Sequence, residues 1–164
     1  MRQGESKMSI KETGLIILHR DILSRGRHIR LRVKGDSMLP MLRDGDVVDV
    51  LQVSPGQLRI GDLLLIETKG GGLLLHRYLT SRVRGGRVWL ITKGDASREV
   101  DTPISPEQVR GRVVQINREG QIVSLEGRKV RLANYALAKL SPYRHLFERV
   151  VRLFNLRKLS PWFR

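Results

Sequence analysis

The stretch that decides the fold reads Gly35-Asp36-Ser37-Met38-Leu39-Pro40-Met41-Leu42-Arg43-Asp44-Gly45-Asp46, and an apolar run, Val47-Val48-Asp49-Val50-Leu51, follows it at once. The hydroxyl of Ser37 lies between turn-forming residues and a proline. A nucleophilic serine needs an exposed side chain on a constrained backbone, with N–H groups nearby to hold an oxyanion. The residues alone leave a second interpretation open, in which Asp36 and Ser37 cap a short helix and residues 44–46 form a hairpin turn.

Short strands separated by turns surround this stretch. Residues 30–34 alternate between apolar and basic side chains and predict a strand that leads into Ser37. Beyond it, turns rich in glycine separate further apolar runs, and strands are predicted at 46–53, 62–68, 73–83, 87–93, 110–117 and 121–125. Strands at this spacing, without helices between them, predict a mainly β protein with a closed or folded, barrel-like antiparallel sheet rather than an α/β fold.

Helices are predicted at both ends of the chain. Apolar positions between Ser9 and about Arg25 indicate a short N-terminal helix. Near the C-terminus, the segment from Ser141 to Lys158 has an apolar stripe opposite a basic face and predicts an amphipathic helix. The chain is therefore divided into three regions: an N-terminal helical lead-in (1–29), a β domain (30–128) and a basic C-terminal helical region (129–164).

The composition restricts the partners and the chemistry. The chain has no cysteine, which excludes disulfides and thiol catalysis. Its net charge is +15, from 31 basic and 16 acidic residues, and the region from residue 129 onward has nine basic residues against Glu148 alone. Such an excess suggests an acidic partner, either nucleic acid or the anionic face of a membrane. No apolar run approaches the roughly 18 residues of a spanning helix, and the N-terminal run is unlike a signal peptide.

Four short motifs occur in a fixed order. They are Ser37-Met38-Leu39-Pro40, His76-Arg77 on an apolar run, Thr92-Lys93-Gly94-Asp95 with Asp101 beyond it, and Gly111-Arg112-Val113-Val114. Together they resemble the catalytic core of the type I signal peptidases and LexA-type serine peptidases. The histidine in place of a lysine base is most similar to the archaeal and endoplasmic-reticulum branch of the signal peptidases.

The resemblance implies a role for each candidate residue. Ser37 would be the nucleophile, His76 its general base, Asp101 the carboxylate that orients the imidazole, and Asp95 a supporting carboxylate. Lys93 is interpreted as a solvated strand end rather than as a base. The family often places a serine two positions before the nucleophile, but this chain has Gly35 there. The oxyanion is therefore expected to depend on backbone N–H groups, including that of Ser37.

Three functions remain open. The first is a serine endopeptidase of the signal-peptidase kind that cleaves a leader or membrane-proximal peptide through an acyl-enzyme, without metal or cofactor. It is expected to be cytoplasmic or to contact anionic membranes through its C-terminal helix. The second is a LexA-like regulatory or nucleic-acid-binding module with at most self-cleavage. Only 29 residues precede the first strand, which is short for a DNA-binding domain and makes nucleic acid the less favoured partner. The third is an inactive relative.

Overall fold

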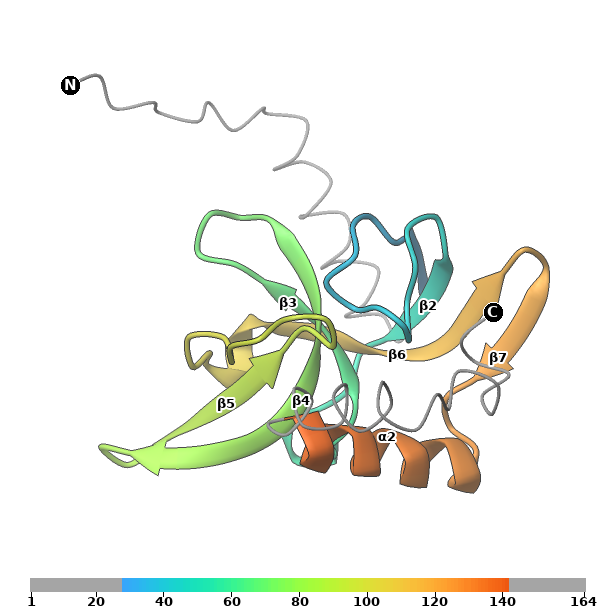
Figure 1. Cartoon of the computed structure of the whole chain (residues 1–164). Helices are drawn as coiled ribbons and strands as arrows, with labels where there is room; N and C mark the ends of the chain where they lie inside the picture. The colour runs from blue at the N-terminus through green and yellow to red at the C-terminus, as the bar shows by residue number, and fades with distance from the viewer. Residues whose placement is uncertain (1–27, 142–164) are drawn as a thin grey trace, which may run out of the picture.

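The computed structural model describes residues 28–141. Within that range the chain folds into one antiparallel sheet and a single long helix (Figure 1). The strands and helices are β1 (Ile29–Arg32), β2 (Val47–Leu51), β3 (Leu63–Glu67), β4 (Leu73–Arg84), β5 (Arg87–Lys93), β6 (Val109–Arg118), β7 (Gln121–Ser124) and α2 (Arg128–Leu140), with short 3-10 turns at Pro55–Gln57 and Pro106–Gln108.

The strand order explains why the sheet folds on itself. It runs β1-β2-β6-β3-β4-β5, and β7 pairs with β6. The long strand β6 therefore joins the two halves, because its first part pairs with β3 and its later part with β2 and β7. Register shifts interrupt three of the ladders, between Asp49 and Val50, between Leu65 and Ile66, and between Tyr78 and Thr80. Such irregularities bend strands and increase their twist.

The core lies on both faces of β3. Successive side chains of a strand point to opposite faces. Leu63 and Leu65 accordingly belong to one apolar cluster with residues of β2 and β6, while Leu64 and Ile66 belong to a second cluster with Tyr78 and Leu90. The uninterrupted apolar run of β3 follows from this burial on both faces.

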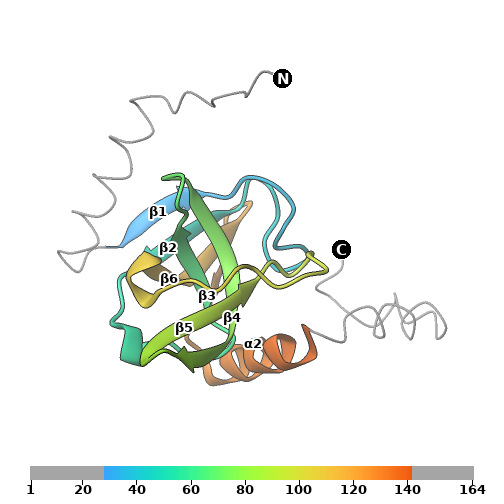
Figure 2. The ribbon, with the colours of Figure 1, turned by 90° about the vertical axis from the view of Figure 1, so that its left-hand side faces the viewer.

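Helix α2 lies against the sheet beside β4 (Figures 1 and 2). Asn134 and Ala138 are buried on its inner face, whereas Leu132, Leu137 and Leu140 are exposed on the outside. None of the helices in residues 28–141 is long and apolar enough to cross a membrane.

The structure confirms the mainly β, folded antiparallel fold expected from the sequence. Every predicted strand is present, with ends that differ by at most a few residues. Helix α2 lies in the region expected to be helical but begins at Arg128 and ends before Ser141. The predicted helices at 9–25 and 141–158 lie outside the described residues, apart from Ser141 itself.

Candidate active site

Ser37 lies in the loop between β1 and β2, and this loop is held firmly to the core. Met38 and Leu42 point inward and are 2% and 0% exposed, which leaves Ser37 at the surface. The ends of the loop are joined by the hydrogen bond from Val33 N–H to the Asp46 carbonyl, 2.7 Å long. The sequence expectation of an exposed serine on a constrained backbone therefore matches the local structure.

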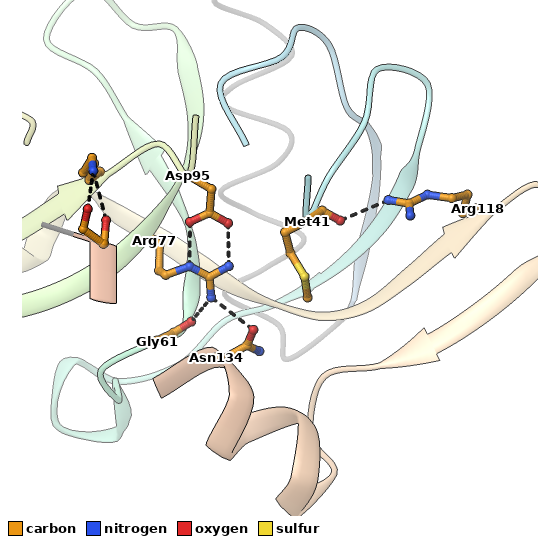
Figure 3. A network of polar contacts seen from close by, with 8 residues as sticks. Met41, Gly61, Arg77, Asp95, Arg118 and Asn134 are labelled. Atoms are coloured by element: carbon orange, nitrogen blue, oxygen red, sulfur yellow. Dashed lines mark hydrogen bonds and ion pairs between the residues drawn. The ribbon is translucent and has the colours of Figure 1, made fainter. Parts of the chain in front are cut away.

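Arg118 of β6 holds the far side of this loop. Its guanidinium donates to both carboxylate oxygens of Asp46, at 2.9 and 2.6 Å. It also donates to the Met41 carbonyl at 3.0 Å, as Figure 3 shows. Burial would raise the pKa of Asp46, but the hydrogen bonds from Arg118 and from Arg43 N–H outweigh it and hold the pKa below its ordinary value. The ion pair thus fastens the loop to the strand that joins the two halves of the sheet.

His76 and Asp101 form a hydrogen-bonded pair near Ser37. His76 is on β4 and 6% exposed, and its Nδ1 lies 2.5 Å from Asp101 Oδ2. The Thr92 hydroxyl of β5 donates to the same oxygen at 2.8 Å, and Asp101 N–H donates to the Thr92 carbonyl. Burial would raise the pKa of Asp101, yet the hydrogen bonds from His76 and Thr92 outweigh it and lower the pKa. An ionised Asp101 fixes the proton of the imidazole on Nδ1.

The other imidazole nitrogen, Nε2, is buried and has no hydrogen-bond partner in the structure of residues 28–141. In the neutral tautomer with its proton on Nδ1, an imidazole has a free lone pair on Nε2. A buried polar atom left without a partner is rare and calls for an explanation.

Gly94 locates Nε2 relative to Ser37. A Cβ atom built on Gly94 would lie 2.9 Å from His76 Nε2 and 2.7 Å from the Ser37 carbonyl oxygen. Both groups are thus within contact distance of one point. The Ser37 carbonyl also accepts a hydrogen bond from Ala96 N–H, at 2.8 Å. The loop that follows β5 therefore contacts the nucleophile candidate and the base candidate together, as the meeting of these loops in Figure 2 illustrates.

Asp95 points away from this group and pairs with Arg77. Arg77 is completely buried, and its Nε and Nη2 donate to the two oxygens of Asp95 at 2.7 and 2.6 Å (Figure 3). Its Nη1 donates to the Gly61 carbonyl at 2.9 Å and to Asn134 Oδ1 at 3.1 Å. Of the four residues expected in the site, the structure brings His76 and Asp101 into hydrogen-bond contact, sets Ser37 beside them, and places Asp95 on Arg77.

The interpretation of Lys93 as a solvated strand end is wrong. Lys93 is only 3% exposed, and its ammonium donates to the carbonyl and the hydroxyl of Ser141, at 2.9 and 3.1 Å. It lies at the end of β5 beside the C-terminal end of α2, where helix carbonyls attract a cation. The apolar run before Lys93 pointed to a strand but gave no sign of a helix packed across its end.

Two further residues support the site but were not predicted from the sequence. Thr92 belongs to a sequence motif that gives no sign of the hydrogen bond from its hydroxyl to Asp101. Asn134 lies in a helix that no motif marked, and no local signal predicted its contact with Arg77. Among residues 28–141, no group of three or more histidine, cysteine or acidic side chains is arranged to hold a metal ion.

Comparison with known families agrees with this geometry. The family model described as Peptidase S24-like matches residues 3–114, and the chain belongs to this family. Two similar relatives, both named LexA repressor and both from strains of Cereibacter sphaeroides, are 35% identical over 98 residues. The alignment covers 57% of this chain and 40% of each relative, so the chain matches less than half the length of those proteins. The expected membership of the LexA-like serine peptidase superfamily is confirmed, whereas the signal-peptidase branch stays a prediction.

Proposed function

We propose that the protein is a serine peptidase in which Ser37, His76 and Asp101 cleave a peptide bond. The observation that carries this proposal is the imidazole of His76, which has Nδ1 on an acidic partner and a buried, unpartnered Nε2 beside the Ser37 backbone. A serine hydroxyl is a weak nucleophile at neutral pH and needs such a base.

The mechanism follows from the roles of the atoms. The Ser37 hydroxyl oxygen attacks the substrate carbonyl while His76 Nε2 accepts its proton. Asp101, kept ionised by its lowered pKa, holds the imidazole in orientation and stabilises the imidazolium. His76 then protonates the leaving amine, and an acyl-enzyme remains on Ser37. A water molecule, deprotonated by His76, releases it. Backbone N–H groups near Ser37 would hold the oxyanion, because Gly35 offers no hydroxyl there.

Lys93 does not serve as the base in this proposal. Its ammonium is held as a donor by Ser141 at the end of α2. A lysine base must lose its proton and point at the nucleophile, whereas this one is bound to acceptors.

The substrate proposal is a leader or membrane-proximal peptide, as in signal peptidases. It is supported by the His76-Arg77 motif and by the Thr92–Asp95 motif with Asp101. Exposed Leu132, Leu137 and Leu140 on the outer face of α2, together with the basic tail, support contact with an anionic bilayer. Sedimentation with anionic vesicles tests this contact. Binding should weaken in high salt, and a chain truncated after Tyr143 should bind less.

A second candidate is a LexA-like regulatory module that cleaves only itself. It is favoured by the relatives named LexA repressor and by the family match. In that case Ser37 attacks a peptide bond of its own polypeptide and becomes acylated by it. Nucleic acid is then the expected acidic partner.

One experiment separates the two candidates. The purified chain and its Ser37→Ala variant are incubated alone and with a mixture of unstructured peptides, and all masses are followed with time. A peptidase acting on other substrates cleaves the peptides and leaves its own mass intact. In a self-cleaving module, the intact chain is replaced by two fragments at a rate that does not depend on protein concentration. A wild-type chain that cleaves neither the added peptides nor itself overturns the proposal. A gel-shift titration over a range of salt concentrations tests nucleic-acid binding in parallel.

A further inference from the structure

Helix α2 lies outside the part of the chain that the family model matches. The family model ends at residue 114, and α2 begins at Arg128. The helix nevertheless contacts the structural supports of the candidate active site at three separate points.

The first contact is a direct approach of two backbones. A Cβ on Gly61 would lie 2.6 and 2.7 Å from the backbone carbonyl atoms of Asn134 and 2.7 Å from Tyr135 N. Gly61 also has a φ of +98°, a conformation that a side chain would strain. The turn before β3 therefore rests on the helix with no room for any residue but glycine.

The second contact continues from Gly61 into the buried arginine. The Gly61 carbonyl and Asn134 Oδ1 both accept hydrogen bonds from Arg77 Nη1 (Figure 3). With these two acceptors and Asp95, each of the three guanidinium nitrogens of Arg77 has a partner. Asn134 is itself 7% exposed, so water cannot readily replace it as the acceptor.

The third contact ties the end of the helix to β5. Lys93 donates to Ser141, and the next residue in the chain is Gly94. The segment that starts there is fixed at Lys93 by the end of α2 and at Asp95 by Arg77. Gly94, between these two residues, lies against His76. Ala96, which follows Asp95, donates its N–H to the Ser37 carbonyl.

We propose that α2 positions the loop of residues 94–97 against Ser37 and His76, and that Asn134 is a positioning residue that acts through Arg77 and Asp95. Without an acceptor at position 134, the guanidinium keeps only the Gly61 carbonyl on that side. It can then rotate, and the bidentate pair with Asp95 loses its geometry. The effect on catalysis rests on the proposed function, but the effect on the loop does not.

A matched pair of full-length variants tests the proposal. Asn134→Leu keeps the approximate size of the side chain and removes the acceptor, whereas Asn134→Asp keeps an acceptor oxygen. Ala136→Ser, at an exposed position of the same helix, controls for general effects on α2. Two quantities are measured at a temperature where every variant is folded: hydrogen exchange at the Ala96 amide, and the rate at which a fluorophosphonate labels Ser37.

We expect Asn134→Leu to lower the protection of the Ala96 amide about tenfold, because the loop opens more readily when Asp95 is less firmly held. The labelling rate should fall by about tenfold or more, since small displacements of reacting groups cost large factors in rate. Asn134→Asp should restore both quantities to within about twofold of the wild type, and Ala136→Ser should change neither.

The outcomes are separable. Unchanged Ala96 protection in Asn134→Leu overturns the proposal, whatever the labelling shows. Reduced protection with an unchanged labelling rate overturns the link between the loop and the site. If Asn134→Asp behaves like Asn134→Leu, the role of the acceptor is refuted. Absence of labelling in the wild type refutes the proposed function, and hydrogen exchange at Ala96 still decides whether the helix holds the loop.

Discussion

Gly94 offers the sharpest test of how the site is assembled, because a single methyl group there has calculable consequences. In Gly94→Ala, the new Cβ would lie 2.6 Å from Ser97 Oγ, 2.7 Å from the Ser37 carbonyl oxygen and 2.9 Å from His76 Nε2. The Ser97 hydroxyl can rotate away, but the Ser37 carbonyl is backbone and His76 is held by Asp101. The variant must therefore move the nucleophile candidate and the base candidate apart.

The size of the effect follows from these distances. Each contact is about 0.5–0.8 Å shorter than an ordinary van der Waals contact, and a displacement of about 1 Å can cost a factor of about 100 in rate. We expect kcat/KM to fall by about ten- to a hundredfold. The free energy of unfolding should fall by about 1–3 kcal/mol, the usual cost of an overpacked site. The displacement also acts on the 2.8 Å hydrogen bond between Ala96 N–H and the Ser37 carbonyl.

Peptide hydrolysis and urea denaturation measure the two effects. Gly56→Ala is the matched control, because a Cβ on Gly56 meets nothing within 4 Å. It should leave activity unchanged. Gly94→Ala with a kcat/KM within about twofold of the wild type would refute the close packing of Gly94, Ser37 and His76 on which the site is built.

Three further predictions concern the carboxylates. Asp101→Asn should lower kcat about a thousandfold or more, because the amide favours the wrong imidazole tautomer, while Asp95→Asn should lower kcat much less. Steady-state kinetics in which Asp95→Asn is the slower variant would reverse the two roles. Asp95→Ala leaves the buried Arg77 guanidinium without its ion partner and should cost about 3–5 kcal/mol of stability in urea denaturation, so a loss below about 1 kcal/mol would contradict the burial of this pair. The lowered pKa of Asp101 contributes stability that is present above its unfolded pKa of about 3.9 and is lost as the pH falls through the folded pKa. Asp101→Asn should therefore weaken the loss of stability in acid, and an identical pH dependence in the variant would argue against the contact with His76.

The sequence predicted the sheet well because its signals are local. Alternation in residues 30–34, the apolar run of β3 and glycine-containing turns each reflect the backbone of a few neighbouring residues. The ordered motifs also identified His76 and Asp101, which the structure brings into contact across 25 positions. That contact could be expected only from the family resemblance, since no local pattern relates β4 to the segment after β5.

The rest depends on contacts between distant segments. Lys93 ends an apolar strand, and its burial follows only from the approach of Ser141, 48 positions later. Arg77 is paired with Asp95, 18 positions away, and its partner on α2 is 57 positions away. Asn134 lies in a helix whose inner and outer faces both contain apolar residues, so periodicity could not show which face packs on the sheet.

The most direct test of the central claim is covalent labelling of the hydroxyl that the site is built around. The wild-type chain, Ser37→Ala and His76→Ala are treated with a fluorophosphonate near neutral pH, and the modified residue is located by mass spectrometry of the digested protein. The account predicts one label on wild-type Ser37, none on Ser37→Ala, and a rate for His76→Ala reduced by several orders of magnitude. A wild-type chain that stays unlabelled, or a His76→Ala variant that reacts as fast as the wild type, would contradict it.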